Sequence, residues 1–199
     1  IHRAGFKVAI NGSGGDELFA GYPTYQADTL FKYYRRLPRF VKNLAHRATC
    51  TLPPTFGRVS LDYKLKKYTE CPYDSLPKAH AYWRTMFSKD GLQEIFSTKV
   101  WEQAPVFTRI YDTAFAEIGP GAETINGLLC ADLKSWLIPM LPWVDNISMA
   151  HSVELRLPYL DYRLVDYALS LPANFLFSGW TLKKVMKRFL KDRLPDDVL

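Results

Sequence analysis

The chain has 199 residues, of which 48% are hydrophobic and 15% aromatic, so it holds enough apolar material for a globular core. No apolar run approaches the roughly 18 residues of a membrane-spanning helix, and the first residues show no signal-peptide pattern. Three widely separated cysteines and four histidines without metal-ligand spacing predict neither a disulfide framework nor a zinc site. We therefore expect a cytoplasmic protein without a membrane anchor. Because Ile1 is not a methionine, we also expect a fragment of a longer polypeptide.

The net charge of +6 is unevenly distributed along the chain. Residues 32–67, called the basic block below, hold ten basic side chains against the single carboxylate Asp62. Such a block can bind nucleic acid or an acidic partner protein, but it is more often the solvated face of a helix. No nucleic-acid-reading motif accompanies the block, so nucleic acid is the less favoured partner. The sequence leaves open whether the protein forms an oligomer.

The first elements in chain order are a strand and a helix. Residues 7–10 form a short β-branched apolar run that ends at Asn-Gly, which predicts a buried strand leading into a turn. Apolar residues then recur at helical spacing over 24–36, with basic residues on the other side, and Pro38 follows. This pattern predicts an amphipathic helix.

Later segments are also mostly helical in pattern. Residues 153–157 alternate between apolar and charged side chains, which predicts a second extended piece. Asp161 is the expected N-cap of one helix, and Thr181 marks the start of another. Prolines divide the rest into segments of helical length. The predicted fold class is mainly α with one or two short strands.

The segment NGSGGDELFAGY combines glycines with two adjacent carboxylates. Gly12, Gly14 and Gly15 would let backbone N–H groups approach an anion such as a phosphate. No lysine follows the glycines, as it would in a P-loop, and Asp16 and Glu17 stand there instead. Asp16 can bind Mg²⁺ that bridges to phosphates, or it can cap the following helix, which is the commoner role for an aspartate in this position.

Two further constellations lie near the carboxyl end. In an extended segment Glu154 and Arg156 point to the same side, so they can form an ion pair or frame a polar substrate. The segment TLKKVMKRFLKDRLP is a basic helix, whose lysines can reach solvent or an anionic pocket.

In this order, NGSGGDELFAGY, DNISMAHSVELRLPYLD and KKVMKRFLKDRLP resemble the three motifs of the glutamine-hydrolysing asparagine synthase family, to which β-lactam synthetase is related. The resemblance implies a parent α/β domain of the adenine-nucleotide α-hydrolase-like (PP-loop) fold, of which residues 1–199 would be the carboxyl-terminal portion. It further implies that ATP adenylates the side-chain carboxylate of aspartate, and that ammonia from glutamine then displaces AMP to give asparagine. ATP and Mg²⁺ are the implied cofactors. A glutaminase domain is expected in the same full-length chain.

The resemblance also implies roles for individual residues. Asn11 and Gly12, with Gly14 and Gly15, would lie against the nucleotide, and Asp16 would hold the Mg²⁺-pyrophosphate. Lys184 matches the lysine of the family's Lys-x-x-Leu-Arg helix and would place positive charge near the reacting groups. The wall around the active site would be shaped by Glu154, Arg156 and Asp161.

The sequence departs from the family pattern at two positions. Ser13 stands where the family usually has an acid implicated in forming the acyl-adenylate, and Asn146 replaces the usual arginine. Ser13 is therefore a candidate catalytic position whose serine removes a charge and a possible base. The alternatives left open are an acyl-adenylating ligase for another carboxylate, and a non-catalytic homologue that binds through the basic block. The upstream pyrophosphate loop lies outside the 199 residues, so we expect the fragment alone to be inactive.

Overall fold

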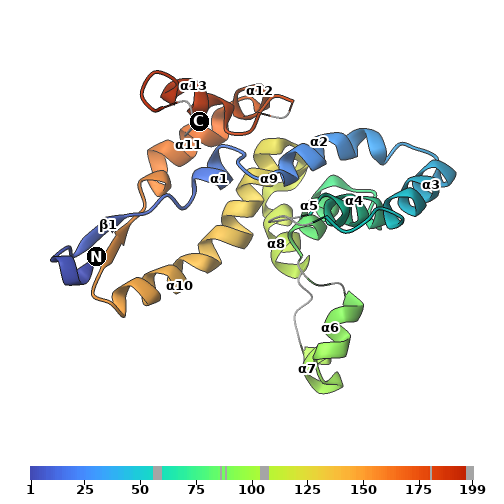
Figure 1. Ribbon diagram of the computed structural model, residues 1–199, viewed down its shortest axis with the longest axis horizontal. Coiled ribbons are helices and arrows are strands. Elements are labelled where there is room, and N and C mark those ends of the chain that lie inside the picture. Colours follow the sequence, from blue (N-terminus) through green and yellow to red (C-terminus); the bar gives the residue numbers. More distant parts are fainter. Residues whose placement is uncertain (56–59, 86, 88, 104–107, 180, 196–199) are drawn as a thin grey trace. The chain divides into compact units, whose positions relative to one another are not determined.

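The computed structural model describes residues 1–55, 60–85, 87, 89–103, 108–179 and 181–195 (Figure 1). The chain divides into two compact units. The first unit comprises residues 1–25 and 113–199, and the second unit comprises residues 26–112. Most of the described residues are helical and two short strands pair with each other, which confirms the predicted fold class. None of the described helices is both long and apolar enough to span a membrane.

The first unit contains both strands and most of the predicted motifs. Two helices, α2 (Thr24–Tyr34) and α8 (Thr108–Ile118), cross its boundaries with the second unit. Its remaining elements in chain order are η1 (His2–Ala4), β1 (Val8–Ile10), α1 (Gly15–Leu18), η2 (Gly119–Glu123), α9 (Ile125–Asp132), η3 (Leu133–Leu137), α10 (Ile138–Met149), β2 (Glu154–Arg156), η4 (Pro158–Leu160), α11 (Tyr162–Ser170), α12 (Ala173–Leu176) and α13 (Lys184–Leu190).

The two strands lie side by side and run parallel (Figure 1). Val8 pairs with Glu154, and Ile10 pairs with Arg156. The predicted strand at 7–10 is thus confirmed, but the expectation that it is buried is wrong. The side chain of Ile10 is 80% exposed, because β2 is the only strand that pairs with β1 among the described residues.

Helix α9 runs through the core of the first unit. Leu128 and Leu129 are fully buried, and Leu18 of α1 is buried in the same unit. Asp132, at the end of α9, is also fully buried, and its carboxylate accepts a hydrogen bond from the hydroxyl of the buried Tyr25. The pairing satisfies two polar groups that would otherwise be costly to bury.

Prolines do not end the helix where the sequence predicts a break. Pro139 and Pro142 both lie within α10, at its start and in its interior. A π-helical segment, η3, precedes α10 directly and widens the helix. Helix α9 ends at Asp132, η3 spans Leu133–Leu137 and α10 begins at Ile138, so the three segments follow one another without a break. Residues 125–149 therefore form one nearly continuous helical rod.

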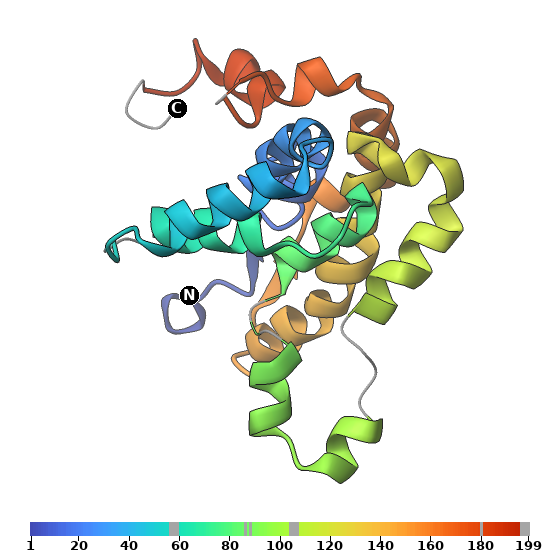
Figure 2. The same ribbon diagram turned by 90° about the vertical axis from the view of Figure 1, so that its right-hand side faces the viewer.

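The second unit is a set of helices around an aromatic core. After α2 it contains α3 (Arg39–Cys50), α4 (Leu61–Glu70), α5 (Leu76–Arg84), α6 (Lys89–Ile95) and α7 (Thr98–Gln103). Helices α3 and α4 pack against each other (Figure 2). Phe31 makes edge-on contacts with Tyr68 and Trp83, whose rings stack on each other at 5.3 Å. The buried carboxylate of Asp28 accepts a hydrogen bond from Trp83 Nε1 through one oxygen. Its other oxygen lies 2.7 Å from His80 Nδ1.

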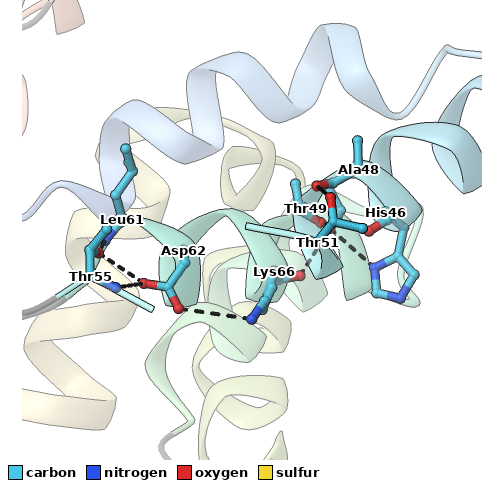
Figure 3. A network of polar contacts seen from close by, with 9 residues as sticks. His46, Ala48, Thr49, Thr51, Thr55, Leu61, Asp62 and Lys66 are labelled. Atoms are coloured by element: carbon cyan, nitrogen blue, oxygen red, sulfur yellow. Dashed lines mark hydrogen bonds and ion pairs between the residues drawn. The ribbon is translucent and has the colours of Figure 1, made fainter. Parts of the chain in front are cut away.

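The described residues of the basic block lie on α2, α3, α4 and the segments between them, and Arg58 lies outside the described residues. Some of its lysines are engaged within the second unit: Lys42 lies 3.7 Å from the Asp74 carboxylate, and Lys66 lies 3.9 Å from Asp62 (Figure 3). Asp62 also accepts hydrogen bonds from the backbone N–H and hydroxyl of Thr55, both at 2.9 Å. The use of the block to bind nucleic acid or an acidic partner stays a prediction.

Helix ends agree with the sequence at some positions and differ at others. Helix α2 ends at Tyr34, two residues before the predicted end, and a turn follows. Asp161 is confirmed as the N-cap of α11, since its side chain accepts from the N–H of Arg163 at 2.9 Å. Thr181 is not adjacent to its helix: α13 begins at Lys184, and Thr181 instead forms a short bridge with Ser178.

Candidate active site at the carboxyl end of the two-stranded sheet

The glycine loop follows β1 and is tied to β2 by its first residue. The N–H of Asn11 donates to the carbonyl of Arg156 at 2.8 Å. The side-chain oxygen of Asn11 accepts from both the N–H and the hydroxyl of Ser13, each at 2.7 Å. This is the Asx-type turn that asparagine favours after a strand. The Ser13 hydroxyl therefore donates its hydrogen bond within the loop itself.

Two glycines of the loop lie directly against the second motif. Gly14 has a φ of +96°, and a Cβ there would approach Leu160 Cδ2 to 2.9 Å. A Cβ on Gly15 would lie 3.2 Å from the ring of Tyr159. Tyr159 also meets Phe19 edge to face at 6.2 Å. The missing side chains thus let segments some 145 residues apart in sequence pack closely, which is one structural use of these glycines.

Asp16 does not cap the short helix α1. The N-cap position is Gly14, and no side chain bonds to the helix end. Asp16 Oδ1 instead lies 2.8 Å from Lys183 Nζ, and the two side chains are 40% and 35% exposed. The capping interpretation of Asp16 is therefore wrong. The pair joins the first motif to the third.

Backbone geometry allows the close approach of Asp16 and Lys183. A Cβ at Gly21 would lie 1.8 Å from Asp16 Oδ1 and 2.4 Å from Lys183 Cε, so no other residue fits there without displacing the pair. Lys183 has a φ of 52°, and Ala20, next to Gly21, also has a φ of 52°. Left-handed conformations cost a residue with a Cβ roughly 1–2 kcal/mol. Two such residues at one site mark it as locally strained.

The neighbouring lysine points elsewhere. Lys184 Nζ donates to the backbone carbonyl of Asn174 at 3.0 Å. The lysine beside Asp16 is thus Lys183, which sequence reasoning missed. The apolar position of the Lys-x-x-Leu-Arg pattern could have identified it: starting at Lys183 puts Met186 in the leucine position, whereas starting at Lys184 puts Lys187 there.

The three predicted wall residues bond to neighbours within their own segment. Arg156 Nη2 and Glu154 Oε1 form an ion pair at 2.8 Å on one face of β2, as their spacing predicts. Asp161 receives two hydrogen bonds from the Arg163 guanidinium, at 3.0 and 2.7 Å. These bonds, with the Arg163 N–H, lower the pKa of Asp161 to about 2. Asp161 therefore stays ionised and anchors the start of α11.

Glu17, beside Asp16, has a different environment. Its side chain is only 2% exposed, and its carboxylate accepts from the Tyr22 hydroxyl at 2.7 Å. A buried, hydrogen-bonded carboxylate of this kind holds the loop in shape. Of the two adjacent acids, only Asp16 presents its carboxylate to solvent.

The donor set around Asp16 allows one mode of Mg²⁺ binding. Among the described residues, no group of three or more His, Cys, Asp or Glu side chains could hold a metal by itself. A single carboxylate fits an ion whose other ligands are water and phosphate oxygens, as is usual for Mg²⁺ with nucleotides. The residues present thus suit Mg²⁺ delivered with a nucleotide.

Comparison with known families decides the classification. The family model described as asparagine synthase matches residues 1–199. The chain belongs to the asparagine synthase family. Membership agrees with the three motifs, which in the structure meet around β1, β2 and the Asp16–Lys183 pair.

Individual relatives of this asparagine synthase family member share modest identity. A Mycobacterium tuberculosis protein provisionally named asparagine synthetase (glutamine-hydrolysing) is 28% identical over 200 residues, which cover 99% of this chain and 29% of the relative. Asparagine synthetase 1 of Bacillus subtilis is 25% identical over 193 residues, which cover 96% of this chain and 29% of the relative. Amidase chyE of Penicillium rubens is 28% identical over 232 residues, which cover 100% of this chain and 31% of the relative. No solved structure matches the chain. The chain thus spans about three tenths of the length of these curated relatives.

Proposed function

We propose that the polypeptide containing this chain forms an amide from aspartate and ammonia by ATP-dependent adenylation, with glutamine as the ammonia source. The Asp16–Lys183 pair, with Nζ and Oδ1 2.8 Å apart, carries the proposal. It brings a carboxylate and an ammonium together next to a glycine loop. The names of the bacterial relatives, which are glutamine-hydrolysing asparagine synthetases, support the choice of substrates.

Stability alone does not account for this pair. An ion pair as exposed as Asp16 and Lys183 contributes at most about 1 kcal/mol. Holding Lys183 at a φ of 52° costs as much or more. Strained residues that persist for little gain in stability are typical of functional sites, where geometry is selected for chemistry.

In the proposed reaction, the carboxylate of Asp16 and the ammonium of Lys183 have separate roles. A carboxylate is a poor electrophile, whereas an acyl-adenylate has AMP as a good leaving group, so adenylation makes attack by ammonia feasible. Mg²⁺ bound with the nucleotide would neutralise charge on the departing pyrophosphate. In our proposal Asp16 holds this ion. The loop of Asn11, Gly12, Gly14 and Gly15 borders the nucleotide.

We assign the role expected of Lys184 to Lys183 instead. The ammonium of Lys183 can donate hydrogen bonds to phosphate or carboxylate oxygens where negative charge develops, which is the usual electrostatic contribution of a lysine. Lys184, the next residue of the chain, donates to the backbone carbonyl of Asn174 instead. This makes the two lysines a matched pair for mutagenesis.

One observation favours a second candidate substrate. Ser13 replaces an acid, and its hydroxyl donates to Asn11 at 2.7 Å. A site without that acid has one fewer group to handle a proton or to distinguish aspartate from other acids. The alternative is therefore the same adenylating amide synthesis on a different carboxylate.

An assay of the full-length protein separates the two substrates. ATP, Mg²⁺ and glutamine or ammonium are supplied with aspartate, glutamate or aromatic and aliphatic carboxylates in turn, and AMP and pyrophosphate are measured. We expect both products to form with aspartate, together with asparagine. Products formed only with another carboxylate would favour the alternative. No AMP with any carboxylate would reject adenylation.

A further inference from the structure

Helix α3 of the second unit packs along one side and is exposed along the other. Its half-buried residues recur at helical spacing and are Val41, Lys42, Ala45, His46 and Thr49. Two of them tie the helix to α4, because Thr49 Oγ1 lies 2.9 Å and His46 Nδ1 lies 3.2 Å from the hydroxyl of Thr69. The residues on the opposite side of α3 therefore point away from α4.

The side of α3 that points away from α4 is both apolar and basic. Phe40 and Leu44, one helical turn apart, are 73% and 68% exposed. Arg47 lies one turn beyond Leu44 and Arg39 starts the helix, and both arginines are exposed. An exposed apolar patch with a polar rim is typical of a surface that binds a partner or a membrane.

The basic block has no exposed acid to offset the charge on this side of α3. Its one carboxylate belongs to Asp62, which is buried. Arg36, in the turn before α3, is exposed like Arg39 and Arg47. Lysines of the block pair with acids, whereas none of these three arginines forms an ion pair with another described residue. Their guanidinium groups therefore present positive charge to solvent.

We propose that the side chains of Arg36, Arg39, Phe40, Leu44 and Arg47, which we call the α3 face, bind the surface of an anionic lipid bilayer. The two apolar side chains enter the headgroup region, and the arginines lie at the level of the lipid phosphates. Guanidinium suits this position because its planar fork donates two hydrogen bonds to one phosphate. The protein is then held at the membrane surface without a spanning helix.

Other occupants account for the α3 face less completely. Nucleic acid would neutralise the arginines, but its phosphate backbone gives Leu44 no apolar contact. A second copy related by a two-fold axis would set the same positive charges against each other. An acidic folded protein needs about 800 Å² on each side of the interface. One side of this 12-residue helix, about 18 Å long and about 10 Å wide, offers roughly a quarter of that area.

Binding of the full-length protein to lipid vesicles tests this proposal without any measurement of activity. The protein is sedimented with vesicles of phosphatidylcholine alone or of phosphatidylcholine with about 30% phosphatidylglycerol, in about 0.1 M salt. We expect the partition coefficient to be at least about tenfold higher with the anionic lipid. It should fall towards the neutral-lipid value at about 0.5 M salt, because salt screens the attraction. Equal binding to the two kinds of vesicle, or binding to neither, would overturn the proposal.

Matched substitutions in the second unit show whether the α3 face is the surface that binds. Leu44→Ser should lower the partition coefficient on anionic vesicles at least about threefold, whereas Ile95→Ser, at a side chain that is 63% exposed, should leave it unchanged. Arg47→Gln should lower it about fivefold, and Lys99→Gln, the same charge change on α7, much less. Equal losses within each matched pair would show that binding does not depend on the α3 face, and would overturn the proposal.

A parallel titration separates lipid from other anions. The full-length protein and its Leu44→Ser variant are titrated with duplex RNA and with polyglutamate in the same buffer. We expect both polyanions to bind more weakly than the anionic vesicles. Binding to either polyanion that Leu44→Ser leaves unchanged, without binding to the vesicles, would assign the basic block to nucleic acid or an acidic partner and overturn the lipid proposal.

Discussion

Lys183 Nζ lies 2.8 Å from Asp16 Oδ1, although 167 residues separate them in sequence. Gly21 makes room for the pair, since a Cβ there would lie 1.8 Å from the carboxylate oxygen. The contact links the glycine loop after β1 to the start of α13. An asparagine synthase family chain thus places one carboxylate and one ammonium where its first and third motifs meet.

Neutralising the two adjacent acids of the loop should have different effects, on AMP formation for Asp16 and on stability for Glu17. Asp16→Asn removes a half-exposed charge, so we expect AMP formation by the full-length protein to fall at least about 100-fold with little change in melting temperature. Glu17→Gln places an amide donor in a buried site, which should destabilise the protein by about 1–3 kcal/mol and leave turnover mostly intact. Equal loss of turnover in both variants would contradict the assignment of Asp16.

Ala20 and Gly21 offer a test of the backbone at the site. Ala20→Gly should be neutral or stabilise the protein by up to about 1 kcal/mol, because relief of the left-handed φ of 52° outweighs the loss of one buried methyl group. Gly21→Ala should abolish AMP formation, because its Cβ displaces Asp16 or Lys183. Thermal unfolding and the AMP assay measure both variants. Full activity of Gly21→Ala would show that the close contact is not needed.

Ser13 tests whether a carboxylate in the loop contributes to catalysis. A general acid or base typically contributes 10²–10⁴-fold to a rate. We expect Ser13→Glu to raise aspartate-dependent kcat at least about tenfold, and Ser13→Ala to change it less than about threefold, since the hydroxyl is bonded to Asn11. Initial rates of AMP release provide the measurement. A large loss in Ser13→Ala would instead indicate that the serine itself acts on the substrate.

The environment of Asp62 should make the stability of the second unit depend on pH. Hydrogen bonds from Thr55 lower its pKa from 3.8 to about 2. A lowered pKa means that the ionised carboxylate stabilises the fold above about pH 4, and that this stabilisation is lost as the pH falls through 4 to 2. Asp62→Asn should therefore have a lower melting temperature than wild type at pH 7, and the difference should shrink towards pH 2.5. The exposed Asp74 provides a control: Asp74→Asn should show a small difference at every pH. A constant Asp62→Asn difference across this range would refute the prediction.

Local patterns predicted the elements well. The alternation of residues 153–157, the cap at Asp161 and the apolar spacing over 24–36 each depend on neighbouring residues, and the structure confirms all three, with the end of α2 shifted by two residues. The start of α13 was misplaced because Lys183 adopts a left-handed conformation, which helix-capping patterns do not predict for lysine.

Long-range contacts were less accessible from sequence. A carboxylate after glycines can be a cap or a ligand, and only its distance to Lys183 decides against the cap. Similarly, the apolar run at 7–10 predicts a buried strand, yet Ile10 is 80% exposed, because burial depends on the number of strands that pair, and β2 is the only partner of β1 among the described residues.

The central claim is that Lys183, together with Asp16, serves the chemical step. Its most direct test is the single-turnover rate of AMP formation in the full-length protein with saturating ATP, Mg²⁺ and aspartate, for Lys183→Met and Lys184→Met. Our account predicts a loss of at least about 100-fold for Lys183→Met and less than about threefold for Lys184→Met, with both variants folded by circular dichroism. The reverse order, or equal losses in the two variants, would contradict it.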